Sequence, residues 1–209
     1  MKVLALDLST KTGWAILSQE NDIIRLLDHG LIQVTECKEK QYPWSYLEKA
    51  KQIADGILQI LPSDVDHIVI EETNGSRARF TQKMLEFIHA AVLSTFYFDM
   101  AMPLDKINYV DTSQWRKVLG ITLNKEQKKA NAKLSKAKRK AITDKAKLDK
   151  KALGIRGKIT PKHLSVIYAN ETYGLNFKVK DNDRADALAL GTAFLKGAKT
   201  HRDKEGTEE

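Results

Sequence analysis

Two short apolar segments of the chain each end in a carboxylate. Lys2–Asp7 has the sequence KVLALD and His67–Glu71 has the sequence HIVIE, so each run is almost continuously apolar up to its last residue. Strands that alternate so little are typical of a sheet that is buried on both faces. Because a charged residue at the end of a buried strand is costly unless something pairs with it, Asp7 and Glu71 indicate a candidate site at the sheet edge.

The remaining chain divides into segments with strand or helix periodicity. We expect strands at 2–7, 14–17, 23–34, 67–70 and 106–110, and helices at 45–61, 77–98, 112–119, 160–173 and 181–196. Thr160 and Pro161 form a favourable helix start. This order predicts an α/β fold, in which helices cover the faces of a central mixed sheet.

Length and composition limit the class of protein. The chain has 209 residues, which fits one domain; we expect it to span 1–197, followed by a polar, disordered tail at 198–209. Cys37 is the only cysteine, which excludes an intramolecular disulfide framework and suits a reducing compartment. No apolar run approaches the roughly 20 residues that span a bilayer, so we expect a cytoplasmic protein without membrane contact.

The positive charge is concentrated in residues 124–158, which we call the basic arm. The arm carries twelve Lys and two Arg against three acidic residues, a net charge of +11, whereas the rest of the chain sums to −3. Its many Ala, Lys and Leu residues favour helix. Clustered Lys and Arg bind nucleic-acid phosphates, although such a charge run is also typical of a solvated linker. The residues that we expect to bind DNA are Arg77, Arg79, Arg116, Lys117, Lys128, Lys129, Lys133, Lys136, Lys138, Arg139 and Lys140.

Two further acidic residues complete a candidate metal site. Asp183 and Asp186 lie three residues apart at the start of the last expected helix, so they share one face of it. If this helix start meets the two strand ends, four carboxylates converge, and divalent cations such as Mg²⁺ stabilise a cluster of this kind. Two such ions about 4 Å apart can activate water and stabilise the leaving oxygen of a phosphodiester. The pattern therefore predicts a hydrolytic nuclease that needs no His or Cys nucleophile.

Each of these acidic residues also has a purely structural interpretation. Asp7 could cap the turn that follows it, and Asp181 or Asp183 could act only as the N-cap of the last helix. Glu72 could replace its neighbour Glu71 as the ligand. Short motifs are weak when taken singly, but the four positions together are harder to explain as caps.

Three segments resemble the acidic motifs of RuvC-type Holliday junction resolvases. They are Val3–Ala15 (VLALDLSTKTGWA), Ile68–Glu71 (IVIE) and Asp183–Ala189 (DRADALA), the last of which is similar to the family's D-x-x-D-A-x-A motif. Trp115–Gly120 resembles the basic stretch that precedes that last motif. The segments occur in the family's order and frame residues 2–195, nearly the whole chain.

The resemblance implies an RNase H-like fold with a five-stranded mixed sheet in the order 3-2-1-4-5, flanked by helices. The composition of the basic arm adds a helical insertion to this fold. It implies that Asp7, Glu71, Asp183 and Asp186 are catalytic residues that bind two Mg²⁺ ions, for which Mn²⁺ substitutes. It also implies a homodimer, packed through the helix at 77–98, that nicks a four-way DNA junction symmetrically in recombination and repair. Phage-encoded members are similar in size, so a phage source and a bacterial host cytoplasm are expected.

The chain departs from the family pattern in two places. The family's loop after the second acidic motif often carries an aromatic residue that wedges into the junction, whereas here Glu72–Gly75 reads ETNG and the nearest aromatic is Phe80. The basic arm is an added element that could embrace junction arms or shift the preference toward flaps and forks. An RNA-processing nuclease of the same superfamily and a non-catalytic nucleic-acid-binding protein therefore stay as alternatives.

Overall fold

The centre of the structure, a computed structural model, is a five-stranded mixed sheet. The model describes residues 1–209 apart from 36, 39, 73–78, 146, 150–156 and 206–209. The strands are β1 (Lys2–Asp7), β2 (Lys11–Glu20), β3 (Ile23–Gln33), β4 (His67–Glu71) and β5 (Ile107–Val110). They lie in the order β3-β2-β1-β4-β5, with β1 antiparallel to β2 and parallel to β4, and β4 parallel to β5. The expected mixed sheet and its strand order are confirmed.

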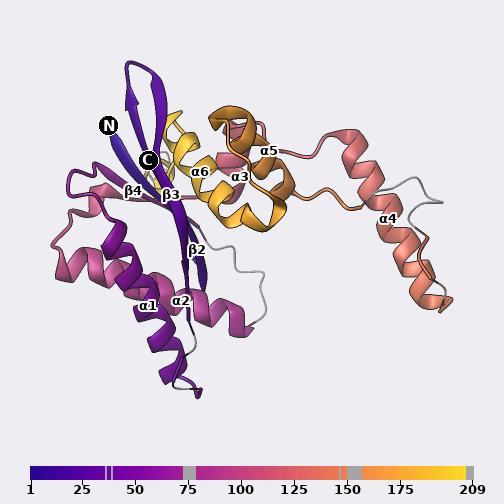
Figure 1. Cartoon of the computed structure of the whole chain (residues 1–209), viewed down its shortest axis with the longest axis horizontal. Coiled ribbons are helices and arrows are strands. Elements are labelled where there is room, and N and C mark those ends of the chain that lie inside the picture. The colour runs from indigo at the N-terminus through magenta and orange to yellow at the C-terminus, as the bar shows by residue number, and fades with distance from the viewer. Residues whose placement is uncertain (36, 39, 73–78, 146, 150–156, 206–209) are drawn as a thin grey trace.

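Helices cover both faces of the sheet (Figure 1). One face carries α1 (Trp44–Ile60) and α2 (Arg79–Ser94); the other carries α6 (Asn182–Leu195), with α3 (Thr112–Val118) and α5 (Pro161–Tyr173) beside it. Shorter turns lie at Thr95–Asp99, Leu104–Lys106 and Val179–Asp181. Strand β1 accounts for the two layers, because its successive side chains point to opposite faces. Leu4 and Leu6 join the α1–α2 core, whereas Val3 and Ala5 join the α6 core.

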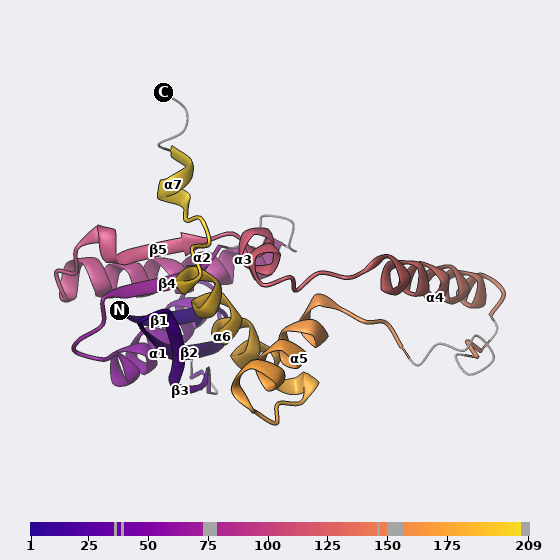
Figure 2. The same cartoon turned by 90° about the horizontal axis from the view of Figure 1, so that it is seen from above.

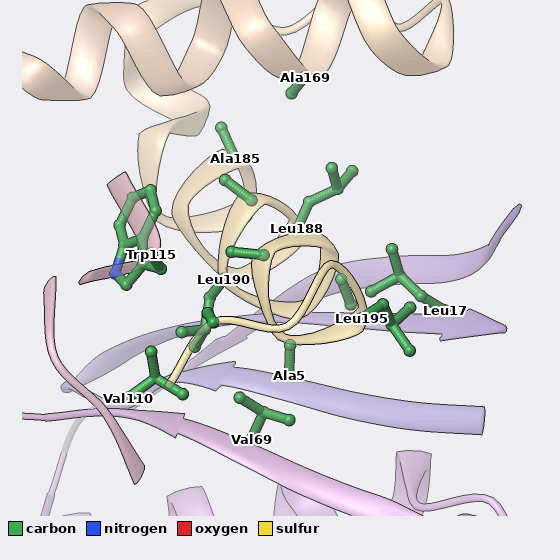
Figure 3. Close-up of a cluster of buried hydrophobic side chains, with 14 of the residues drawn as sticks. Ala5, Leu17, Val69, Val110, Trp115, Ala169, Ala185, Leu188, Leu190 and Leu195 are labelled. Atoms are coloured by element: carbon green, nitrogen blue, oxygen red, sulfur yellow. The ribbon is translucent and has the colours of Figure 1, made fainter. Parts of the chain in front are cut away.

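Helix α6 lies so close to the sheet that glycine is required at the contact. In Figure 3, Ala5 and Leu17 of the sheet point toward α6. A Cβ on Gly191 of α6 would lie 2.6 Å from Leu17 Cδ1 and 2.9 Å from Ala5 Cβ. A Cβ on Gly13 of β2 would lie only 1.9 Å from the carbonyl oxygen of Asp183. Gly13 therefore lets the first turn of α6 rest on the sheet next to the end of β1.

Within the basic arm, residues 125–143 form a helix that stands away from the rest of the molecule (Figures 1 and 2). This helix, α4 (Lys125–Thr143), begins with a capping box in which Asn124 and Gln127 each accept a hydrogen bond from the other's backbone N–H. Asn131 ties α4 to the returning chain: its Nδ2 donates to the Ile159 carbonyl oxygen at 2.6 Å, and its Oδ1 accepts from the Ile159 N–H at 3.0 Å. A helical insertion is thus confirmed over 125–143.

The C-terminal segment differs in part from the disordered tail that the sequence predicted over 198–209. Residues His201–Glu205 form a short helix, α7, and the remaining residues 206–209 lie outside the described chain. Thr200 directly precedes the helix, and both its backbone N–H and its hydroxyl donate hydrogen bonds to the Asp203 carboxylate. His201 Nε2 also lies 2.6 Å from Glu72 Oε2, so local capping and one long-range contact order this segment.

None of the helices in the described ranges combines the length and the apolar character that crossing a membrane requires.

The contact at Gly13 leads to a stability prediction. Gly13→Ala places a methyl group against the α6 backbone, which cannot move aside as a side chain can, so we expect the free energy of unfolding to fall by about 1–3 kcal/mol. Gly56→Ala is the matched control, because its added methyl meets the Ile32 side chain and improves helix propensity in α1. Urea unfolding measures both variants. A Gly13→Ala protein as stable as wild type would contradict the close contact.

Candidate active site

The four carboxylates come from three elements that meet at one end of the sheet. Asp7 ends β1 and Glu71 ends the parallel neighbour β4, while Asp183 and Asp186 occupy the first two turns of α6. The pKa of Asp7 lies well above its usual range, first because burial removes the carboxyl from water and then because Glu71, Asp186 and Asp183 surround it with negative charge. The fold therefore brings together all four predicted acidic residues.

Asp186 has the smallest exposed fraction of the four carboxylates in this cluster. It is 2% exposed, and burial is the main cause that raises its pKa to about 6. The negative charge of Glu71 adds to this rise, whereas a hydrogen bond from Ser165 and the positive charges of Arg116 and Lys162 oppose it. A carboxyl with this pKa changes its protonation state close to neutral pH.

Three basic side chains lie against the cluster and offset part of its charge. Lys11 Nζ is 3.2 Å and Lys162 Nζ is 3.4 Å from separate oxygens of Asp183. Arg116 lies 3.8 Å from Asp186 Oδ1. Because Lys11 and Lys162 come from β2 and α5, these ion pairs join elements that are distant in the sequence.

Glu71 and Glu72, the two candidate ligands at the end of β4, have different partners. The Thr112 hydroxyl, at the start of α3, donates a hydrogen bond to Glu71. Glu72 instead has its Oε2 2.6 Å from Nε2 of His201 in α7. The charge of Glu71 acts on both Asp7 and Asp186, so Glu71 lies with the cluster.

The donor set of the cluster fits a hard divalent cation. Within the described residues, no three His, Cys, Asp or Glu side chains already stand close enough together to form a metal site. However, Oδ1 of Asp186 is buried without a hydrogen-bond partner, and the repulsion that raises the pKa of Asp7 is the kind that a cation relieves. The donors are all carboxylate oxygens, which Mg²⁺ and Mn²⁺ prefer over the ligands of zinc or copper sites. The cluster thus suits Mg²⁺ by ligand chemistry.

The basic residues predicted to bind DNA occupy three places. Arg116 is directed toward Asp186 of the cluster. Its guanidinium carbon also lies 4.7 Å from the centroid of the Trp115 ring, on which it stacks. Lys117 and Arg79 are exposed at the surface. Arg77 lies outside the described residues. The others lie along α4, namely Lys128, Lys129, Lys133, Lys136, Lys138, Arg139 and Lys140.

Four residues at the site have no role in the sequence analysis. They are Lys11, Lys162, Thr112 and Ser165, which contact or influence the acidic residues. Lys11 lies within the first acidic motif, so its place in the sequence was a usable signal. The others depend on how α3 and α5 pack beside α6, and sequence spacing carries no information on this packing.

Comparisons with known proteins support the fold. No protein-family model and no curated protein sequence matches the chain. Among solved structures, the chain is similar to T. thermophilus RuvC in complex with a Holliday junction substrate, at 15% identity and a TM-score of 0.54 over 96% of this chain and 98% of that one. A second Thermus thermophilus RuvC structure gives 18% identity and a TM-score of 0.53 over 96% and 99%. The yeast mitochondrial Holliday junction resolvase Ydc2 is 13% identical, with a TM-score of 0.52 over 93% of this chain and 77% of that one.

The protein thus has the RNase H-like fold that is found in RuvC-type resolvases. This confirms the resemblance that the acidic motifs indicated, at the level of the fold.

The raised pKa of Asp186 leads to a prediction on pH dependence. A carboxyl whose pKa is raised on folding from 3.8 to about 6 stabilises the native state at low pH and loses that contribution as the pH rises through 6. Without metal, Asp186→Asn should therefore raise the free energy of unfolding by roughly 3 kcal/mol at pH 8 and by about half as much at pH 5, because the loss accrues between pH 3.8 and 6. Urea unfolding in EDTA at both pH values measures the difference. A difference independent of pH would contradict the buried, repelled state of Asp186.

Proposed function

We propose that this protein is a metal-dependent endonuclease that resolves four-way DNA junctions by paired symmetric nicks. The observation that carries the proposal is the cluster of Asp7, Glu71, Asp183 and Asp186 at one end of a RuvC-like sheet. A cap or a core residue needs no such convergence, since each carboxylate raises the cost of ionising its neighbours. Capping therefore explains single positions but does not account for the cluster.

In this proposal the four carboxylates hold two Mg²⁺ ions, and Mn²⁺ substitutes for them. When bound, such ions supply an activated water and stabilisation of the leaving oxygen. Thr112 holds the Glu71 carboxylate in place through its hydrogen bond. Arg116 and Lys162 supply positive charge beside the cluster, where the phosphodiester of the substrate brings further negative charge.

Paired nicks require two such sites, and we propose that a homodimer supplies them. The α1–α2 layer is the candidate contact surface. A groove of about 830 Å³ lies between these helices and is lined by Leu47, Ala50 and Phe87 among others, and Leu58 and Phe98 in the same layer are exposed. Apolar surface of this extent on a helical layer favours association with another protein surface.

The test is a cleavage assay on a labelled synthetic four-way junction with Mg²⁺ or EDTA. Wild type should give symmetric nicks that require the metal and spare a linear duplex of the same sequence. Asp7→Asn and Glu71→Gln should each lower the cleavage rate at least 100-fold while retaining junction binding, because they alter metal ligands and leave the basic arm intact. Glu72→Gln, one residue from Glu71, should stay within a few-fold of wild type because its partner is His201.

Assays on flaps, replication forks and RNA in parallel identify the substrate class. If the protein cleaves only one of these substrates, that substrate takes the place of the four-way junction in the proposal, and the nuclease activity itself is supported. Tight binding without cleavage of any substrate in Mg²⁺ or Mn²⁺ would overturn the nuclease proposal. Full activity of Asp7→Asn would overturn the assignment of the metal ligands.

A further inference from the structure

Helix α4 has two faces with opposite roles in the structure. Asn131 and Leu134 are both less than a tenth exposed, although α4 stands away from the sheet and its helices. The hydrogen bonds from Asn131 to Ile159 show that the returning chain covers this side. Lys138 follows Leu134 by four residues and Asn131 by seven, so it belongs to the same side of the helix.

The opposite side of α4 is mostly basic. Helical spacing places on it six exposed basic residues and one exposed acidic residue, Glu126; the six are Lys125, Lys129, Lys133, Lys136, Arg139 and Lys140. We call these six basic residues the outer face. Like charges at this spacing repel each other, so the outer face favours a partner that is itself strongly negative.

We propose that the outer face of α4 lies along a duplex arm of the DNA substrate and holds it by its phosphates, whereas Lys138 contributes less. This inference rests on the proposed function in so far as duplex DNA is the partner. It goes further by assigning the contact to one side of one helix.

The dimensions of α4 suit a duplex arm. Its 19 residues span about 28 Å at 1.5 Å per residue. Over that length a duplex carries about 16 phosphates, roughly half of which face one side, so the six cations of the outer face are comparable in number to the accessible phosphates. Ile142 is the only large apolar residue exposed on α4, which disfavours a lipid surface as partner.

The side chains of α4 also indicate what kind of DNA contact this is. Base recognition uses Asn or Gln at adenine and Arg or Lys at guanine, with the side chain reaching into a groove. On α4, Gln127 is engaged in the capping box and Asn131 in the bonds to Ile159. The outer face therefore presents almost only lysines, which bind phosphates as point charges, and we expect the contact to be independent of duplex sequence.

The arm is anchored close to the active site. Asn131 holds Ile159 through its hydrogen bonds. The two residues after Ile159 are Thr160, the N-cap of α5, and Pro161, the first residue of α5. The next residue, Lys162, contacts Asp183 of the carboxylate cluster. A duplex held along α4 is thus connected through three residues of chain to the site that the proposal assigns to cleavage.

The test compares two double variants with the same change in net charge. Lys129→Gln/Lys136→Gln alters the outer face, and Lys145→Gln/Lys147→Gln removes two exposed charges beyond the end of α4. Gln matches Lys in helix propensity, so the helix is retained. Binding to the junction and to a linear duplex is measured by fluorescence anisotropy in EDTA, at KCl concentrations from 50 to 300 mM.

The outer-face variant should reduce the slope of log K against log [KCl] by about 1.8, which weakens binding about 50-fold near 0.1 M salt. The Lys145/Lys147 variant should keep the wild-type slope. As a comparison within α4, Lys138→Gln should lose less affinity than Lys136→Gln.

Equal slope losses in the two double variants would overturn the inference, because lysines throughout the arm would then contribute equally and no face of α4 would be preferred. Unchanged slopes in both, with the junction still cleaved, would also overturn it while leaving the proposed function intact. A slope loss confined to the outer-face variant, in a wild type that cleaves nothing, would support the duplex contact and reject the nuclease. Wild-type protein that binds no DNA would overturn both.

Discussion

The close contact between α6 and the β1–β2 strand pair is the constraint on which the site depends. Gly13 lies opposite Asp7 in the sheet and directly under the backbone of Asp183, so one glycine sets the distance between two of the carboxylates. The small residues of α6 and the buried strands maintain this contact over the length of the helix (Figure 3). Core packing thus supplies the free energy that holds mutually repelling carboxylates together, a cost that is reflected in the raised pKa values of Asp7 and Asp186.

The balance of charge around this cluster is local, whereas the large positive charge of the chain is remote. Lys11, Lys162 and Arg116 lie against individual carboxylates. The lysines of α4 lie far from the sheet and make the chain strongly basic overall (Figure 2). Under the proposed function, a substrate with many phosphates would meet this positive surface first and the carboxylate cluster second.

Much of the fold and the core of the site could be predicted from the sequence, because continuous apolar runs identify buried strands and a buried strand that ends in a carboxylate is rare without a function. This reasoning located Asp7 and Glu71, and helical spacing joined Asp183 to Asp186. It could not find the partner of Glu72, because His201 lies in a segment whose polar composition predicts disorder. Nor could it separate Lys138 from the other lysines of α4, since a helix that is basic on nearly every side shows no preferred face until the returning chain covers one.

The most direct test of the central claim is to locate the metal. Crystals of the wild-type protein soaked in Mn²⁺ would be measured for anomalous scattering, with Asp7→Asn as the comparison. The account predicts anomalous density among Asp7, Glu71, Asp183 and Asp186 in wild type, and weaker or no density there in the variant. Two results would contradict the claim that these carboxylates form a catalytic metal site. One is Mn²⁺ bound only elsewhere, and the other is a cluster that stays free of metal and keeps its contacts with Lys11, Lys162 and Arg116.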